Sequence, residues 1–140
     1  MTGEAGALAK TGGDWELPVA DEPVTQLRID YAITLLFANG LTLRIEQPFG
    51  LSTRSGEDHV VDPEGGVAQL LPVLGLRRAT ATKGTAFVDG HLDLWFADGR
   101  RLTVPPGDKY EAWQVSGPGK LLIVSVPSGG LSIWGQARAN

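Results

Sequence analysis

The sequence predicts a mainly β (α+β) fold: an antiparallel meander of about eight or nine strands, curved or barrel-like, with one short helix between two similar hairpin halves. Two observations support this prediction. Phe-Ala-Asn-Gly at residues 37–40 is matched by Phe-Ala-Asp-Gly at 96–99, and each lies between runs that alternate apolar and polar residues. An Asn-Gly or Asp-Gly turn between two such runs is the strongest local signal for a β-hairpin. Similar short runs, separated by Gly, Pro and Ser, make up most of the remaining chain.

The domain organisation predicted from composition is simple. A chain of 140 residues with 42% hydrophobic and 20% charged residues is typical of one globular domain with a sizeable core. Residues 1–13 are small, polar and rich in glycine, so we expect an N-terminal tail there. The globular domain is expected to span residues 14–135, followed by a short C-terminal tail at 136–140.

The hydrophobic pattern also predicts the register of the two similar hairpins. A three-residue loop at 38–40 places Leu35 opposite Leu43 and makes one face of the hairpin wholly apolar. A two-residue loop would mix apolar and polar side chains on both faces, so the longer loop is favoured. The second hairpin follows the same rule with a loop at 97–99. Such a loop is a type I turn closed by a glycine with positive φ, a G1 bulge.

The other elements of the first half follow in chain order. We expect a strand at 24–30, the hairpin at 33–45 and a short further strand at 51–54. A helix is expected to begin at Asp62-Pro63-Glu64, with Asp62 as its N-cap, and to end at Gly75. Val67, Leu70, Leu71 and Leu74 then lie on one face of this helix.

The second half continues with a strand at 79–88, the hairpin at 92–104 and a strand at 110–115. A last hairpin is expected to pair 121–126 with 131–134 around a two-residue Ser128-Gly129 loop. The predicted core consists of the inward-facing side chains of all these hairpins, with three leucines of the helix covering them. These are Ile33, Leu35, Phe37, Leu43, Ile45, Leu92, Leu94, Phe96, Leu102, Val104, Val124, Val126 and Ile133, with Leu70, Leu71 and Leu74 as the cover.

Composition and motifs exclude several classes of function. A net charge of −4 argues against nucleic acid as a partner, because duplex binding needs clustered Lys and Arg. With no cysteine and two histidines, we expect no metal site and no thiol chemistry. No nucleotide-binding, zinc-protease or hydrolase motif occurs, so no cofactor is expected either. The chain lacks an apolar run long enough for a signal peptide or membrane span, which predicts a cytoplasmic protein that does not contact membranes.

The spacing of several motifs resembles that of a known protein family. The matching segments are Val24-Thr25, Arg28-Ile29-Asp30-Tyr31, Gly40, Arg44-Ile45-Glu46, Phe96-Ala97-Asp98-Gly99, Leu102-Thr103-Val104-Pro105, Tyr110-Glu111-Ala112-Trp113, Gly117-Pro118 and Gly130-Leu131-Ser132-Ile133-Trp134. Over roughly residues 15–135 the chain is similar to a family of small, mostly actinobacterial proteins without an assigned function. The resemblance implies a fold unit that occurs as a stand-alone protein. It implies no activity, ligand or catalytic residue.

The main candidate site is the polar face of the second hairpin, which carries His91, Asp93, Trp95 and Arg101. In the predicted register Trp95 lies directly opposite Arg101, so the guanidinium can stack on the indole. Tryptophan and arginine dominate the energetics of protein interfaces, which makes this face a candidate binding patch. The alternative is an ordinary solvated face on which the helix or a loop covers Trp95.

Two further groups of polar residues are weaker candidates. Arg28, Asp30, Arg44 and Glu46 lie on the polar face of the first strands and form either a ligand-binding cluster or a set of surface ion pairs. Glu111 lies two residues before Trp113 and would have a raised pKa if the indole desolvated it, as a general acid or base requires. The alternative for Glu111 is a position at the rim of a strand whose tryptophan belongs to the core.

Three functions remain open at this point. The first is a non-enzymatic protein-interaction module, such as an immunity or inhibitor-type protein with a protein partner. The second is a small-ligand-binding β domain with a pocket between the curved sheet and the helix. The third is a small hydrolase or isomerase that uses Glu111 or the pair His91 and Asp93. If the first is right, replacing both Trp95 and Arg101 by alanine should weaken partner binding and leave the melting temperature unchanged.

Overall fold

The structure is a computed structural model and describes residues 9–135. Within this range the chain forms thirteen strands and one α-helix, so the predicted mainly β class is confirmed with more strands than expected. The strands are β1 (Ala9–Thr11), β2 (Asp14–Glu16), β3 (Glu22–Ile29), β4 (Ile33–Phe37), β5 (Thr42–Ile45), β6 (Phe49–Ser52), β7 (Asp58–Val61), β8 (Thr80–Ala86), β9 (Leu92–Phe96), β10 (Arg101–Val104), β11 (Trp113–Gly117), β12 (Leu121–Ser125) and β13 (Leu131–Trp134). The helix α1 (Val67–Leu74) lies between the two similar hairpins, as predicted.

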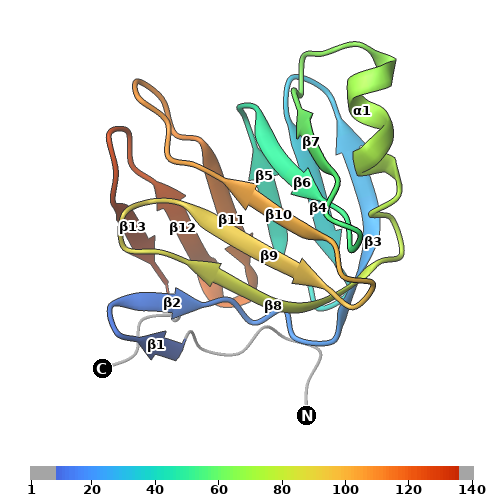
Figure 1. Ribbon diagram of the computed structural model, residues 1–140. Helices are drawn as coiled ribbons and strands as arrows, with labels where there is room; N and C mark the ends of the chain where they lie inside the picture. Colours follow the sequence, from blue (N-terminus) through green and yellow to red (C-terminus); the bar gives the residue numbers. More distant parts are fainter. Residues whose placement is uncertain (1–8, 136–140) are drawn as a thin grey trace.

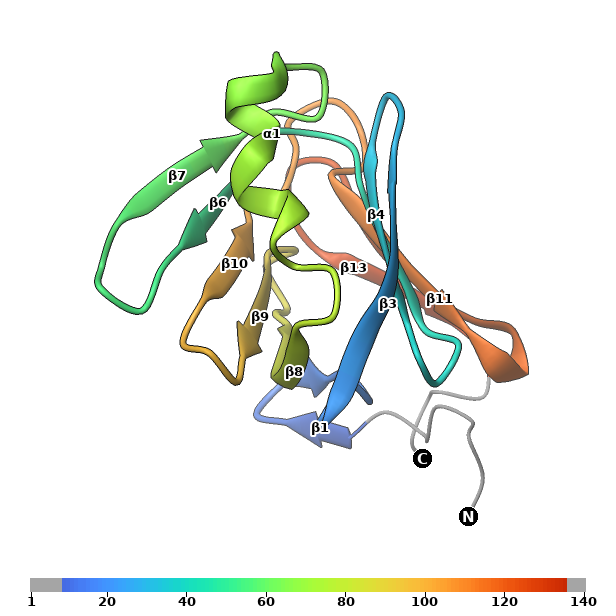
Figure 2. The same cartoon turned by 90° about the vertical axis from the view of Figure 1, so that its right-hand side faces the viewer.

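The strands form one long antiparallel sheet that is folded into two layers (Figures 1 and 2). Its order is β13-β12-β11-β5-β4-β3-β8-β9-β10-β6-β7, with β2 beside β8 and β1 beside β2. Four neighbour pairs, β3–β8, β10–β6, β11–β5 and β2–β8, are not consecutive in the chain, so the topology is more than a simple meander. The sheet does not close, because β13 and β7 end this path at opposite edges.

Strand β3 connects the two layers. Its first residues pair with β8, and the rest of the strand pairs with β4. Side chains from both layers therefore meet in one hydrophobic core. Every core position predicted on the two similar hairpins is buried, which confirms that part of the prediction: Ile33, Leu35, Phe37, Leu43, Ile45, Leu92, Leu94, Phe96, Leu102 and Val104.

The predicted three-residue loops of the two hairpins are present. Leu35 pairs with Leu43 and Leu94 with Leu102, as the apolar face required. In the first loop the Phe37 amide donates to the carbonyl of Leu41 at 2.9 Å, and the second loop has the same bond from Phe96 to Arg100. The glycines that end these loops have φ of +94° at 40 and +92° at 99. Only glycine adopts such a φ without strain, which explains the turn motif.

The likeness of the two hairpins extends one strand further back. β3 has a bulge between Val24 and Gln26 opposite β4, and β8 has one between Ala81 and Lys83 opposite β9. In each case the bulged threonine donates its hydroxyl to a carbonyl of the next strand, Thr25 to Leu36 at 3.2 Å and Thr82 to Trp95 at 3.3 Å. The units β3–β4–β5 and β8–β9–β10 are therefore two copies of one scaffold, each with a bulge that reverses the faces along its first strand.

Replacing Gly40 or Gly99 with valine is expected to destabilise the protein by about 1–3 kcal/mol, because a β-branched residue is strained at positive φ. Gly99→Val should cost more, because a Cβ at 99 would lie 2.7 Å from the Cβ of Arg54. At 40 the nearest atom is a Pro118 side-chain carbon at 3.3 Å. Urea unfolding of both variants measures the difference, and an unchanged midpoint for either one would contradict the loop assignment.

The helix begins later and faces differently from the prediction. Its N-cap is Gly66 and not Asp62. The carboxylate of Asp62 instead accepts a hydrogen bond from the backbone amide of Glu64 in the turn before the helix. The predicted cover of Leu70, Leu71 and Leu74 is wrong for two of the three, since Leu71 and Leu74 are exposed and Leu70 is only partly buried. Val73 and Leu76 pack into the core in their place. Helical periodicity identified an apolar stripe but could not identify which edge of it meets the sheet.

The last three strands also differ from the prediction. β11 begins at Trp113, so Tyr110 and Glu111 lie in the preceding loop. In the final hairpin Ile133 pairs with Ile123 rather than Val124, because the loop has three residues, as in the two similar hairpins, and not two. Val126 and Ile133 are consequently only partly buried. Ser125 is fully buried in this register and donates its hydroxyl to the Gly90 carbonyl at 2.8 Å. A serine on the side predicted to face solvent therefore lies inside.

Two expectations at other positions need correction. The segment predicted as an N-terminal tail includes β1, which pairs with β2, so an ordered hairpin begins at residue 9; residues 1–8 and the predicted tail 136–140 lie outside the described residues. Alternation along the first strands predicts that Tyr31 belongs to the core, but this residue lies in the tight β3–β4 turn and is 80% exposed.

Candidate functional site

The outer face of the β8–β9–β10 layer carries the main predicted site. Two rows of side chains cross it from strand to strand, because residues paired across neighbouring strands share a face. The first row is Lys83, Trp95, Arg101, Ser52 and Asp58, and the second is Glu16, Thr85, Asp93, Thr103, Gly50 and Val60. We call this surface the Trp95 face.

Trp95 lies between two cationic side chains. The guanidinium carbon of Arg101 is 5.2 Å from the centre of the indole, as the predicted pairing required, and the ammonium of Lys83 is 5.5 Å from it. Lys83 was not predicted, because simple alternation places residues 81 and 83 on the same face. The bulge at Thr82 separates them, so Ala81 is buried opposite Phe96 while Lys83 lies outside, opposite Trp95. The helix does not cover Trp95, which is partly exposed.

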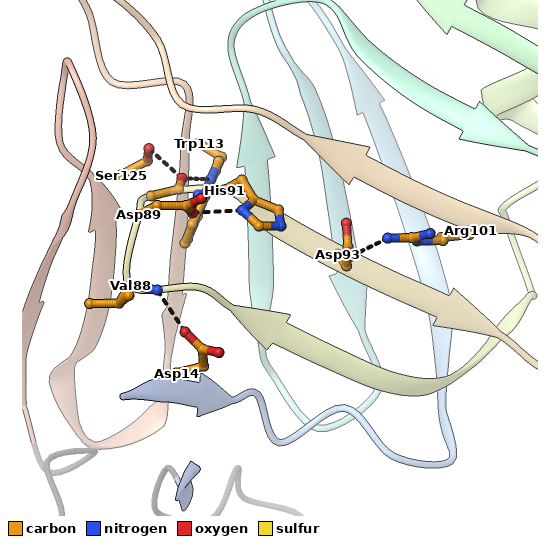
Figure 3. Close-up of polar contacts among 9 residues, drawn as sticks. Asp14, Val88, Asp89, His91, Asp93, Arg101, Trp113 and Ser125 are labelled. Atoms are coloured by element: carbon orange, nitrogen blue, oxygen red, sulfur yellow. Dashed lines mark hydrogen bonds and ion pairs between the residues drawn. The ribbon is translucent and has the colours of Figure 1, made fainter. Parts of the chain in front are cut away.

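Asp93 is buried, although it was expected on an exposed polar face. Its side chain is 2% exposed, and one carboxylate oxygen accepts from the Arg101 guanidinium at 2.5 Å (Figure 3). Among the described residues its other oxygen, Oδ1, has no hydrogen-bond partner. Neighbouring strands bury this carboxylate beside Thr85 and Thr103. Removing Arg101 together with Trp95 is therefore expected to cost stability, contrary to the expectation from the sequence.

His91 lies at the end of the same face but pairs with a different carboxylate. Its Nδ1 is 2.6 Å from Asp89, and its ring stacks on Phe87 with 3.9 Å between the ring centres. The hydrogen bond that the backbone amide of His91 donates to Asp89 lowers the pKa of the Asp89 carboxyl, and the bond with the His91 side chain adds to this effect. Figure 3 shows the loop that carries Asp89 and His91 anchored from both layers. The side chains of Trp113 and Ser125 donate to the Gly90 carbonyl, so His91 belongs to a rigid corner.

The second predicted cluster is a group of surface ion pairs. The Arg44 guanidinium lies 3.2 Å from Glu46 and 3.8 Å from Asp30. Arg28 has no ion-pair partner among the described residues. These residues occupy the outer side of the other layer, which faces away from the Trp95 face because the core lies between them. The two predicted groups therefore do not form one site.

Glu111 does not lie beside an indole. It is exposed in the β10–β11 loop, whereas Trp113 is fully buried and its indole N–H bonds Gly90 at 3.0 Å. The loop borders an open hollow of about 280 Å³ lined by polar side chains that include Glu46 and Lys109. The geometry provides no apolar enclosure that would make Glu111 a general acid or base.

A shallow hollow next to Arg101 is a feature that sequence reasoning missed. Gly50 lies in the second row between Thr103 and Val60, and its missing side chain leaves a depression of about 270 Å³. Asp58 and His59, which the sequence places in a loop by their polar surroundings, belong to β7 and border this hollow. The only sequence signal was a glycine inside a strand, which marks a bulge or a close approach.

The fold and this face define a small two-layer antiparallel β protein whose most distinctive surface is a tryptophan between two cationic side chains, each paired with a carboxylate. The chain belongs to the family of unknown function DUF6188, which matches residues 15–135. This confirms the resemblance to a family without an assigned function. Among curated proteins and solved structures, none is similar enough to the chain to count as a match. None of the described helices has the length and hydrophobicity needed to cross a membrane.

Proposed function

We propose that this protein is a non-enzymatic protein-interaction module, of the kind represented by immunity or inhibitor proteins, and that the Trp95 face binds its partner. Residues such as tryptophan and arginine provide most of the binding energy at protein interfaces. Here the indole is held in place by Lys83 and Arg101, so little side-chain freedom is lost on binding. The hollow at Gly50 lies beside this anchor and can accept a side chain of the partner.

The observation that carries this proposal is the difference between the two copies of the scaffold. The row Lys83–Trp95–Arg101 corresponds to Gln26–Leu36–Thr42 in the first copy. The backbone pairing and the bulge are the same, so folding does not require two cations around an indole at this place. A surface chemistry that the scaffold does not need is best explained by binding.

The partner chemistry follows from the charges of the row. The chain as a whole has a net charge of −4, and Lys83 and Arg101 are both about half exposed on either side of the indole, Lys83 at 3.8 Å from Glu16 and Arg101 paired with Asp93. A partner with an apolar or aromatic group facing Trp95 and carboxylates at the rim complements this arrangement.

The alternatives receive less support from the geometry. A pocket between the curved sheet and the helix would suit a small ligand, but the hollow there, about 360 Å³ in volume, is bordered by exposed side chains such as Tyr31 and Glu64. An enzyme would need His91, Asp93 or Glu111 to converge on a reacting group. His91 bonds Asp89, Asp93 bonds Arg101, and Glu111 lies in another loop.

The test uses a variant that leaves the Asp93–Arg101 pair intact. The immobilised protein is first used to capture binding partners from an extract of its native source. The affinity of the purified partner is then measured by calorimetry. The double variant Lys83→Ala and Trp95→Ala should weaken that affinity by about 100-fold or more, equivalent to about 2.7 kcal/mol. The matched control is Gln26→Ala with Leu36→Ala, which removes the corresponding row of the first copy and should bind like the unmodified chain.

Two results would contradict the proposal. One is that the Lys83→Ala and Trp95→Ala double variant binds the partner as tightly as the unmodified chain does. The other is an equal loss in both variants, which would indicate a general effect of outer-face substitutions. Circular dichroism of each variant shows whether it is folded before its affinity is compared.

A further inference from the structure

We infer that the exposed face of helix α1 is a self-association surface, and that its occupant is the α1 face of a second copy of this chain. The α1 face consists of Ile29, Tyr31, Val67, Leu70, Leu71 and Leu74. It involves none of the residues of the Trp95 face, so this inference does not depend on the proposed function.

The composition of α1 is unusual for a surface helix. Its sequence is Val-Ala-Gln-Leu-Leu-Pro-Val-Leu and contains no charged residue. At about 100° per residue, Val67, Leu71 and Leu74 lie within an arc of about 60° and Leu70 lies next to them. Val73, at the far edge of this apolar arc, is the only fully buried residue of the helix. The sheet therefore covers one edge of the arc, and the remainder faces solvent, where a helix normally carries polar residues.

The exposed apolar surface continues from the helix onto the β3–β4 turn. Ile29, Tyr31 and Leu70 line the same open hollow. Five of the nine large apolar side chains exposed in the described part of the chain belong to this one surface, and Val67 is 75% and Leu71 58% exposed. In Figure 2 the helix lies at one end of the two layers with its outer side uncovered. Such a concentration on one helix and one turn is typical of an interaction surface.

The charges around α1 identify the second copy as the occupant. Glu64, with Asp62, precedes the helix, and Arg77 and Arg78 follow it. Among the described residues Glu64, Arg77 and Arg78 have no ion-pair partner. A two-fold axis across the helix places two α1 helices antiparallel, so the acidic end of each meets the basic end of the other. The face is thus complementary to itself in both hydrophobicity and charge, as an isologous dimer interface requires.

The expected dimer is weak because the interface is small. An α1 of eight residues is about 12 Å long, so the contact buries less than a standard interface of about 800 Å² per partner. We expect a dissociation constant of about 1–100 μM. Sedimentation velocity of the full chain over about 1 μM to 1 mM should show the change from monomer to dimer within this range.

Substitutions on the helix provide the first arm of the test. Leu71→Asp should weaken dimerisation by about 100-fold without unfolding the chain, because Leu71 is exposed. Val67→Lys should have the same effect, and it shows that the effect does not depend on a local disturbance at position 71. The matched control is Val88→Asp, which puts the same charge on an equally exposed apolar residue of the β8–β9 loop. Equal dimerisation of the Leu71→Asp and Val88→Asp variants would overturn the inference.

A charge exchange tests the antiparallel arrangement. Glu64→Arg and Arg77→Glu should each prevent self-association by bringing like charges together. A one-to-one mixture of these two variants should restore a dimer, because its two chains carry charge reversals at opposite ends of α1, so each end of the antiparallel pair again joins opposite charges. Unimpaired homodimers of either variant would overturn the arrangement. A chain that remains monomeric up to about 1 mM would overturn the inference itself, even if α1 binds lipid vesicles or another protein.

Discussion

Replacing Arg101 with methionine is expected to destabilise the protein by about 2–4 kcal/mol at pH 7. The substitution keeps an apolar stem over Trp95 but leaves the Asp93 carboxylate, 2% exposed, without its charged partner. Breaking a fully buried ion pair costs roughly 3–5 kcal/mol. We expect slightly less because Arg101 is 47% exposed, so water can take part of its place. Urea unfolding measures the change as a shift in midpoint at constant slope.

The source of this loss can be separated from lost packing on the indole. Adding Asp93→Asn to Arg101→Met removes the buried charge and should recover more than half of the lost stability. The matched control is Arg44→Met, which breaks ion pairs with the exposed Asp30 and Glu46 and should cost under about 1 kcal/mol. Equal costs for Arg101→Met and Arg44→Met would mean that the burial of Asp93 has no energetic consequence.

Replacing Leu94 with alanine is expected to cost about 2–5 kcal/mol of unfolding free energy. Leu94 is fully buried where the two strands of the second hairpin meet the segment before β3. A Cβ at Gly84 would lie 3.1 Å from Leu94, 3.0 Å from Val19 and 3.2 Å from Leu17. The leucine thus fills space that the glycine leaves open, and shortening it creates a cavity that this rigid sheet cannot close.

The same contact predicts a specific non-additive effect. Gly84→Ala alone should destabilise by about 1–3 kcal/mol through overpacking. Combined with Leu94→Ala, the new methyl group enters the cavity, so the double variant should be more stable than the sum of the two losses by at least about 0.5 kcal/mol. Leu36→Ala, at a partly exposed position, is the control and should cost less than Leu94→Ala. Simple additivity would show that Gly84 and Leu94 do not share this space.

The predictions that the structure confirms all rest on local chemistry. Asn39-Gly40 and Asp98-Gly99 specify the loop, and the alternation of apolar residues then permits one register, so both hairpins could be placed from their own residues. The errors occur where a neighbour distant in sequence decides. Ser125 is buried because the Gly90 carbonyl accepts its hydroxyl, and no pattern within β12 signals that bond.

The candidate site shows the same division. The opposition of Trp95 and Arg101 follows from the sequence, because it depends on one turn and one register. The burial of Asp93 depends on β8 and β10 lying on either side of β9, and the position of Lys83 depends on a bulge. Local residue patterns were enough to specify the β class, the two hairpins and their inward faces. Only the tertiary structure decides which outward-facing side chains are covered and which edge of α1 is exposed. The reason is that burial depends on neighbouring strands that long-range pairing brings together.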